Sequence, residues 1–97
     1  MDTISFPRSW KARYGFSGAA VLSFLIERQS GPDEWFPVRN VDIQDALLIH
    51  PPGIGTARML LASDGVLSVK KVGTQYVYRI NQDRLAEIND ADQEGQE

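Results

Sequence analysis

Two β-rich runs separated by only two residues constrain the fold of this chain more than any other feature. The runs cover residues 66–72 and 75–80, and Gly73-Thr74 lies between them. A two-residue connection that contains glycine is typical of a β-hairpin. Apolar and polar residues alternate along both runs, so each strand has one apolar and one mixed face. Together with helical patterns upstream, the hairpin predicts an α+β fold.

Apolar residues at helical spacing predict three helices before the hairpin. The first is expected over residues 18–28, with Ser17 as its N-cap. The second is expected over 41–48 and the third over 54–63. A turn at 50–53 separates them, because two consecutive prolines interrupt a helix. The predicted core consists of Leu22, Leu25, Ile26, Ile43, Leu47, Ile54, Leu61, Leu67 and Ile80.

Two shorter elements complete the predicted domain. Residues 34–38 have the composition of a brief strand, which its proline assigns to an edge of the sheet. We expect Trp35 and Phe36 in this strand to belong to the core. After the hairpin, a short final helix is expected to turn Leu85 and Ile88 inward.

The 97 residues suffice for one domain, which we expect over residues 17–88. Residues 1–16 form an N-terminal arm of mixed aromatic and basic residues. Its aromatic side chains either pack on the core or reach a partner. If the chain forms a homodimer, the expected contact surface consists of Trp10, Tyr14 and Phe16. Residues 89–97 are acidic with almost no apolar side chain, so we expect a disordered tail.

The residue types that carry catalysis and metal binding are scarce in this chain. There is no Cys, and His50 is the single His. Neither a hydrolytic triad nor a thiolate or histidine-rich metal site can be built from this inventory. We therefore expect a protein that is not an enzyme and that needs neither cofactor nor metal. The lack of Cys, of a signal peptide and of an apolar run of membrane-spanning length favours the cytoplasm.

The charge is distributed unevenly along the chain. The net charge is −3, but six acidic residues and only one base lie from Asp83 onward. Residues 1–82 carry nine bases and seven acids and are mildly basic. This balance is compatible with a local basic surface that contacts nucleic acid, although it is not a strong signature of one.

The order of the predicted elements resembles the winged helix-turn-helix family. The resemblance covers residues 17–81 and rests on two segments. Trp35-Phe36-Pro37-Val38, followed by the sequence of residues 40–47, is similar to the entry of the helix-turn-helix domains in phage and plasmid replication and regulatory proteins. Residues 63–71, around Asp64-Gly65, are similar to that family's passage from recognition helix to wing. The resemblance implies a three-helix core with a C-terminal two-stranded β-wing and a short edge strand.

The resemblance also implies a set of DNA-contacting residues. In the family, the helix after the turn enters the major groove and the wing lies near phosphates. Here that helix would be 54–63, with Arg58 either reading guanine or standing as an ordinary exposed residue. The lysines of the hairpin either clamp phosphates or protect a strand edge from aggregation. The implied DNA-binding residues are Arg39, Thr56, Arg58, Met59, Lys70, Lys71 and Arg79, with Gly55 also facing outward.

Two functions follow from this comparison. The first is a DNA-binding transcriptional regulator or replication accessory of a phage or other mobile element, acting on double-stranded DNA. The second is a winged-helix module that binds a host or phage protein without sequence-specific DNA binding. The second is kept open because the predicted recognition helix carries one Arg and an exposed Met59. The sequence also departs from the family at Leu48, where glycine is usual.

Overall fold

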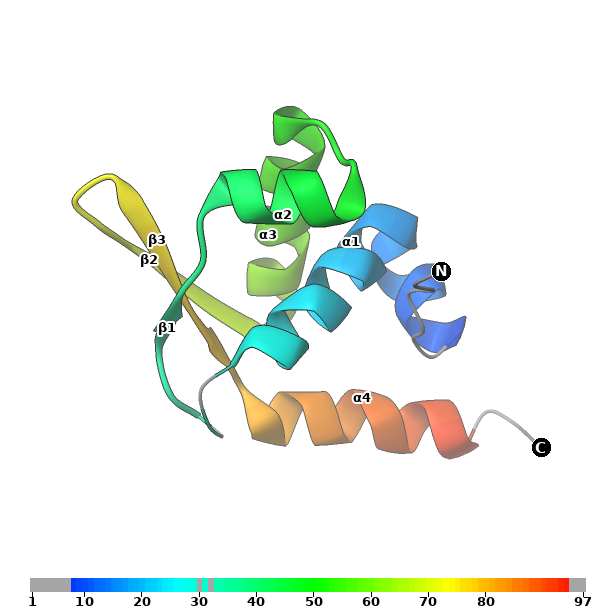
Figure 1. Ribbon diagram of the computed structural model, residues 1–97. Coiled ribbons are helices and arrows are strands. Elements are labelled where there is room, and N and C mark those ends of the chain that lie inside the picture. The colour runs from blue at the N-terminus through cyan, green and yellow to red at the C-terminus, as the bar shows by residue number, and fades with distance from the viewer. Residues whose placement is uncertain (1–7, 30, 32, 95–97) are drawn as a thin grey trace.

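The computed structural model describes residues 8–29, 31 and 33–94. Within these ranges the chain forms four helices and a three-stranded antiparallel sheet, so the expected α+β class is confirmed. Helix α1 crosses the middle of the molecule, with α2 and α3 on one side and α4 on the other (Figure 1). The elements are α1 (Arg8–Arg28), β1 (Phe36–Pro37), α2 (Asn40–Leu47), α3 (Pro51–Asp64), β2 (Leu67–Val72), β3 (Gln75–Ile80) and α4 (Gln82–Glu94).

The sheet has the order β1-β3-β2, so the hairpin carries a third strand on its β3 side. The expected short strand pairs antiparallel with β3, placing Phe36 opposite Tyr78. The hairpin pairs Val72 with Gln75 across the connection, as the two-residue loop predicted. Gly73 has a φ of 66°, which glycine adopts without the steric cost that other residues carry.

Helix α1 begins at Arg8, so the segment expected to be an arm up to residue 16 is helical from there. A kink at Gly15, with φ of 77°, separates the two parts of the helix. The kink directs the first part onto the core, where Trp10 and Tyr14 are buried. The alternative in which the aromatics pack on the core is therefore correct for these two. Phe6 lies outside the described residues.

Helix α3 begins at Pro51, earlier than the predicted residue 54. Proline is tolerated in the first turn of a helix, because the N–H groups there have no partner within the helix. Three residues, from Leu48 to His50, connect α2 to α3. Leu48 adopts the left-handed conformation usual for glycine, with φ of 57°. Gly65 ends α3 in the same region, as predicted.

The core lies between α1, α3 and the sheet. The predicted core residues are buried, except that Ile26 and Leu47 are only partly buried against it. Phe36 is buried as expected, whereas Trp35 is exposed and that prediction is wrong. The sheet turns one face to the helices, and the alternation of side chains leaves Trp35 on the other face.

Helix α4 extends the chain beyond the predicted domain end. It continues to Glu94, so most of the segment 89–97, which was expected to be a disordered tail, is helical. The remaining residues of that segment, 95–97, lie outside the described residues. Ile88 is buried, as predicted. The indole N–H of Trp10 donates to the Asn89 side chain at 3.3 Å, which links the start of α1 to α4.

Candidate nucleic-acid interface

The outward face of α3 is small and uncharged. Thr56 and Met59 are exposed on it, and the Met59 side chain is 70% exposed. The Thr56 hydroxyl donates to the carbonyl of Pro52 at 3.1 Å. Gly55 has open space where a Cβ would stand. The outward face of the helix can therefore make apolar contacts, but it carries no side chain with the paired hydrogen-bond donors that bind a DNA base edge.

Arg58 does not point outward as the resemblance implied. Its guanidinium lies 4.1 Å from the centre of the Tyr76 ring. Its Nε donates to the Tyr78 hydroxyl at 3.1 Å, and its Nη2 donates to Oδ1 of Asn40. These contacts fold the Arg58 side chain against the hairpin and the start of α2. Helix α3 is therefore left without a basic side chain that points outward.

The hairpin lysines lie on opposite faces of the sheet. The Lys70 ammonium is 4.6 Å from the centre of the Trp35 ring, on the face away from α3. The Lys71 ammonium is 5.7 Å from the Tyr76 ring, which also carries Arg58. Consecutive strand residues point to opposite faces, so a single flat partner surface cannot meet both side chains equally.

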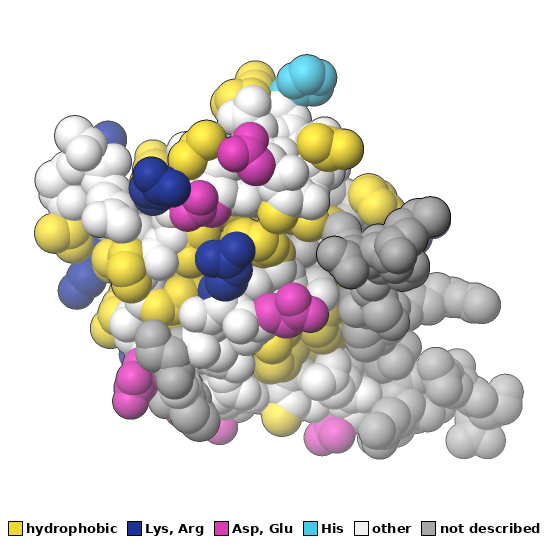
Figure 2. Space-filling view, viewed as in Figure 1, with side chains coloured by type: hydrophobic (Ala, Val, Ile, Leu, Met, Phe, Trp, Pro, Cys, Tyr) yellow, Lys and Arg dark blue, Asp and Glu magenta, His cyan; other side chains and the backbone are white. Residues whose placement is uncertain are grey.

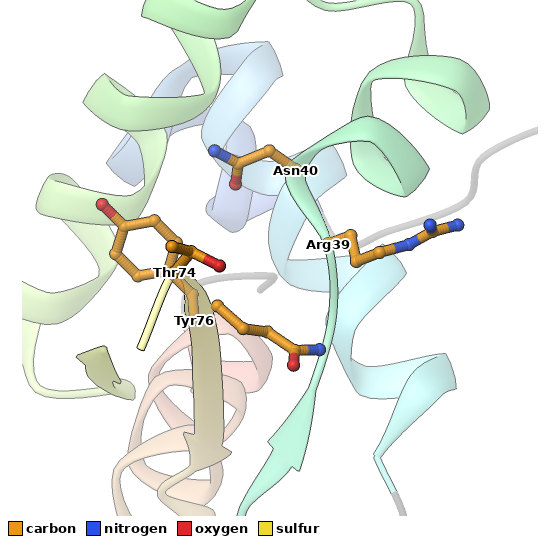
Figure 3. A pocket seen from close by; sticks show the side chains of 5 residues that line it. Arg39, Asn40, Thr74 and Tyr76 are labelled. Atoms are coloured by element: carbon orange, nitrogen blue, oxygen red, sulfur yellow. The ribbon is translucent and has the colours of Figure 1, made fainter. Parts of the chain in front are cut away.

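Arg39 stands at the start of α2, beside a cleft that reaches the hairpin. The cleft has a volume of about 360 Å³ and is lined by Arg39, Asn40, Thr74, Gln75 and Tyr76. Figure 3 shows the Tyr76 ring and the Asn40 amide on either side of the space, with the Arg39 side chain directed away. Arg39 pairs with Asp42 at 3.1 Å, and its hydrogen bonds hold the pKa of the Asp42 carboxyl below its ordinary value.

Arg79 lies apart from this cleft. It shares the Lys70 face of the sheet, and its Nη2 is 3.9 Å from an oxygen of Asp33. Its Nε is buried and has no hydrogen-bond partner among the residues that the structure describes. The structure therefore brings Arg58 and Lys71 together at Tyr76 and leaves Arg39 across the cleft with its side chain directed away. It places Thr56 and Met59 on α3 and separates Lys70 and Arg79 from these groups.

Basic side chains do not form one continuous patch on the face seen in Figure 2, where acidic and neutral side chains separate them. Three partners of Arg58 were not among the predicted site residues: Asn40, Tyr76 and Tyr78. Alternation along the hairpin placed Tyr76 on the apolar face. Its role as a platform for Arg58 depends on the docking of the hairpin beside α3, which periodicity does not reveal.

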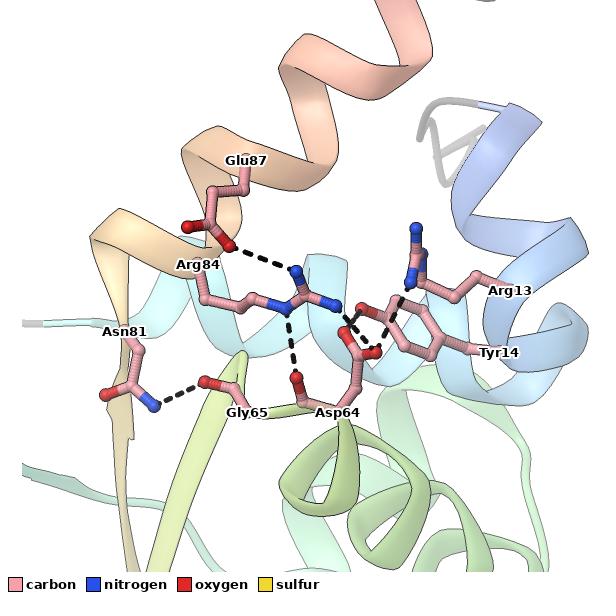
Figure 4. Close-up of polar contacts among 7 residues, drawn as sticks. All are labelled: Arg13, Tyr14, Asp64, Gly65, Asn81, Arg84 and Glu87. Carbon is pink, nitrogen blue, oxygen red and sulfur yellow. Dashed lines mark hydrogen bonds and ion pairs between the residues drawn. The ribbon is translucent and has the colours of Figure 1, made fainter.

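A second polar cluster joins α1, α3 and α4 around Asp64 (Figure 4). Asp64 accepts hydrogen bonds from Tyr14 at 2.6 Å, Arg13 at 3.3 Å and Arg84 at 3.0 Å. Arg84 also pairs with Glu87 at 3.0 Å.

The surface expected for a homodimer is largely absent, because Trp10 and Tyr14 are buried in the fold. Of the three residues expected to form it, Phe16 is 57% exposed.

Within the described ranges, no helix combines the length and apolar character that a bilayer span requires. The same part of the chain holds no group of three His, Asp or Glu side chains placed to bind a metal ion. No protein-family model matches the sequence, and no curated protein or solved structure matches it significantly.

Proposed function

We propose that this chain is a winged-helix domain that binds double-stranded DNA, as a regulator or replication accessory of a phage or other mobile element. One observation carries the proposal: α2 and α3 are joined by three residues, and the sheet of order β1-β3-β2 places the end of its hairpin across a cleft from the start of α2. This arrangement supports a recognition helix and a wing that contact DNA together.

The contacting face consists of the outer side of α3, the start of α2 and the α3-facing side of the hairpin. Thr56 and Met59 meet the groove, while Arg39 and Lys71 meet phosphates. The uncharged surface of α3 supports binding in which phosphate contacts supply most of the affinity. Discrimination among base sequences is correspondingly weak, because base edges are read mainly by hydrogen-bonding side chains.

A second candidate function is favoured by the apolar character of α3. Met59 is 70% exposed and its neighbour Leu60 is 45% exposed. Exposed methionine adapts to apolar partner surfaces. In this alternative, the α3 face binds a protein and the chain has no affinity for DNA.

Binding to a labelled DNA duplex over a series of salt concentrations separates the two functions. We expect duplex binding at low salt that weakens steeply as salt rises. Met59→Asp should weaken it, because the new carboxylate would enter a groove whose walls carry the negative charge of the DNA backbone. Ala86→Asp introduces the same charge at an exposed position of α4 and should leave binding nearly unchanged. Absence of duplex binding by the unmodified chain at low salt would exclude the DNA proposal and leave the protein-binding alternative.

A further inference from the structure

The guanidinium of Arg58 connects three separate elements. Arg58 belongs to α3, Asn40 is the first residue of α2, and Tyr76 and Tyr78 lie on one face of β3. The two tyrosine rings are stacked, with centroids 6.5 Å apart, and the guanidinium lies 4.1 Å from the nearer one. One side chain therefore contacts both helices of the helix-turn-helix unit and the inner strand of the hairpin.

The end of the hairpin is exposed. All residues from 70 to 75 are exposed, including both residues of the connecting loop. The N–H of Val38 donates to the carbonyl of Tyr76 at 3.4 Å, which attaches the hairpin to the segment before α2. The contacts of Arg58 with Tyr76, Tyr78 and Asn40 are thus a principal link between the hairpin and α2.

The chemistry of these contacts requires a guanidinium. Arginine presents donors in a rigid planar fork and stacks on an aromatic face, whereas the lysine ammonium is a compact point charge. At Arg58, Nε and Nη2 donate in two directions while the plane covers Tyr76. A lysine at this position would keep the charge but could not make the three contacts together.

We infer that Arg58 is a positioning residue that fixes the hairpin relative to α2 and α3, and that it does not read a base. The inference rests on the proposed function in one respect: the fixed hairpin presents Lys71 and the cleft to DNA. Its structural part concerns the free protein and is measured without DNA.

The test compares Arg58→Lys, which keeps the charge, with Arg58→Met, which removes it. Arg39→Met is the matched control, because it removes an exposed basic side chain near the start of α2 whose ion pair is with Asp42. In the free protein, we expect amide hydrogen exchange of residues 75–78 to quicken in both Arg58 variants, roughly tenfold for the loss of charged hydrogen bonds. Exchange should be unchanged in Arg39→Met.

Duplex binding gives the second readout. Both Arg58 variants should bind roughly tenfold more weakly with the salt slope unchanged, since a positioning residue holds no phosphate. Arg39→Met should lower the slope by about one. The inference is wrong if Arg58→Lys behaves like the unmodified chain in both readouts. It is equally wrong if Arg58→Met leaves hairpin exchange unchanged and lowers the salt slope by about one, as a direct phosphate contact would.

Failure of the proposed function produces a different result. In that case the unmodified chain does not bind the duplex, and the exchange of residues 75–78 alone decides whether Arg58 positions the hairpin. The milder variant Tyr78→Phe removes only the hydroxyl that accepts from Arg58. It should quicken the same exchange by a smaller factor, which separates loss of the link from general unfolding.

Discussion

The hydroxyl of Tyr14 donates a 2.6 Å hydrogen bond to the carboxylate of Asp64, which joins the first part of α1 to the last residue of α3. Burial and this hydrogen bond raise the pKa of the Tyr14 hydroxyl. Burial alone would also raise the pKa of Asp64, but the hydrogen bonds from Tyr14 and Arg84 and the nearby arginine charges lower it overall. Asp64 is therefore held ionised where three helices meet.

Replacing this carboxylate should reduce stability in a pH-dependent way. Because the pKa of Asp64 is lower in the folded than in the unfolded chain, its ionised form stabilises the fold above the ordinary carboxyl pKa. That contribution is lost as the pH falls through the lowered value. We expect Asp64→Asn to lower the free energy of unfolding by about 1–3 kcal/mol at pH 7. The difference from the unmodified chain should shrink below about pH 4.

Urea unfolding at neutral and acidic pH measures the loss of unfolding free energy in Asp64→Asn and the change of that loss with pH. Asp42→Asn is a suitable control, because Asp42 forms its ion pair with Arg39 at the surface, where such pairs contribute little. A loss of stability in Asp64→Asn that stays constant from pH 7 to pH 3 would contradict the linkage, since the substitution would then act through packing alone.

Truncation of the central helix tests the position of the core. Leu25 is 1% exposed on α1, and Leu25→Ala should lower the free energy of unfolding by about 2–5 kcal/mol through lost transfer energy and a cavity. Ile26 is only partly buried, so Ile26→Ala should cost less. Equal losses for the two variants in urea unfolding would mean that α1 is rotated relative to the core.

Leu48 offers a stabilising substitution. It is 86% exposed and adopts a left-handed conformation that strains any residue with a Cβ. Leu48→Gly should therefore raise the free energy of unfolding by up to about 1 kcal/mol. Ala46→Gly introduces the same residue into helical backbone and should lower it by about 0.5–1 kcal/mol. Thermal unfolding distinguishes the two, and destabilisation by Leu48→Gly would contradict the left-handed conformation.

Local patterns predicted most of the architecture because they act over short distances. Helical spacing identified Leu22, Leu25 and Leu61 as core, and strand alternation with Gly73-Thr74 defined the hairpin. The end of α3 was predicted from Gly65, since a left-handed residue there stops a helix. Each of these features is set by residues within a few positions of one another.

The features that sequence reasoning missed depend on contacts between distant segments. The chain is helical before the kink at Gly15 as well as after it, and this first part places Tyr14 beside Asp64, fifty positions away. Arg58 has the same sequence signature whether it points to solvent or folds over Tyr76. Only the docking of the hairpin beside α3 decides between these orientations.

The most direct test of DNA binding by the α3-facing side of the hairpin compares Lys71→Ala with Lys70→Ala. The two residues are adjacent in β2 and carry the same charge, but they lie against Tyr76 and Trp35 on opposite faces. The measurement is the slope of duplex affinity against salt concentration on logarithmic scales. We expect Lys71→Ala to reduce the slope by about one, and Lys70→Ala to leave it unchanged. Equal slopes for both variants and the unmodified chain, or a reduction only in Lys70→Ala, would contradict the proposed interface.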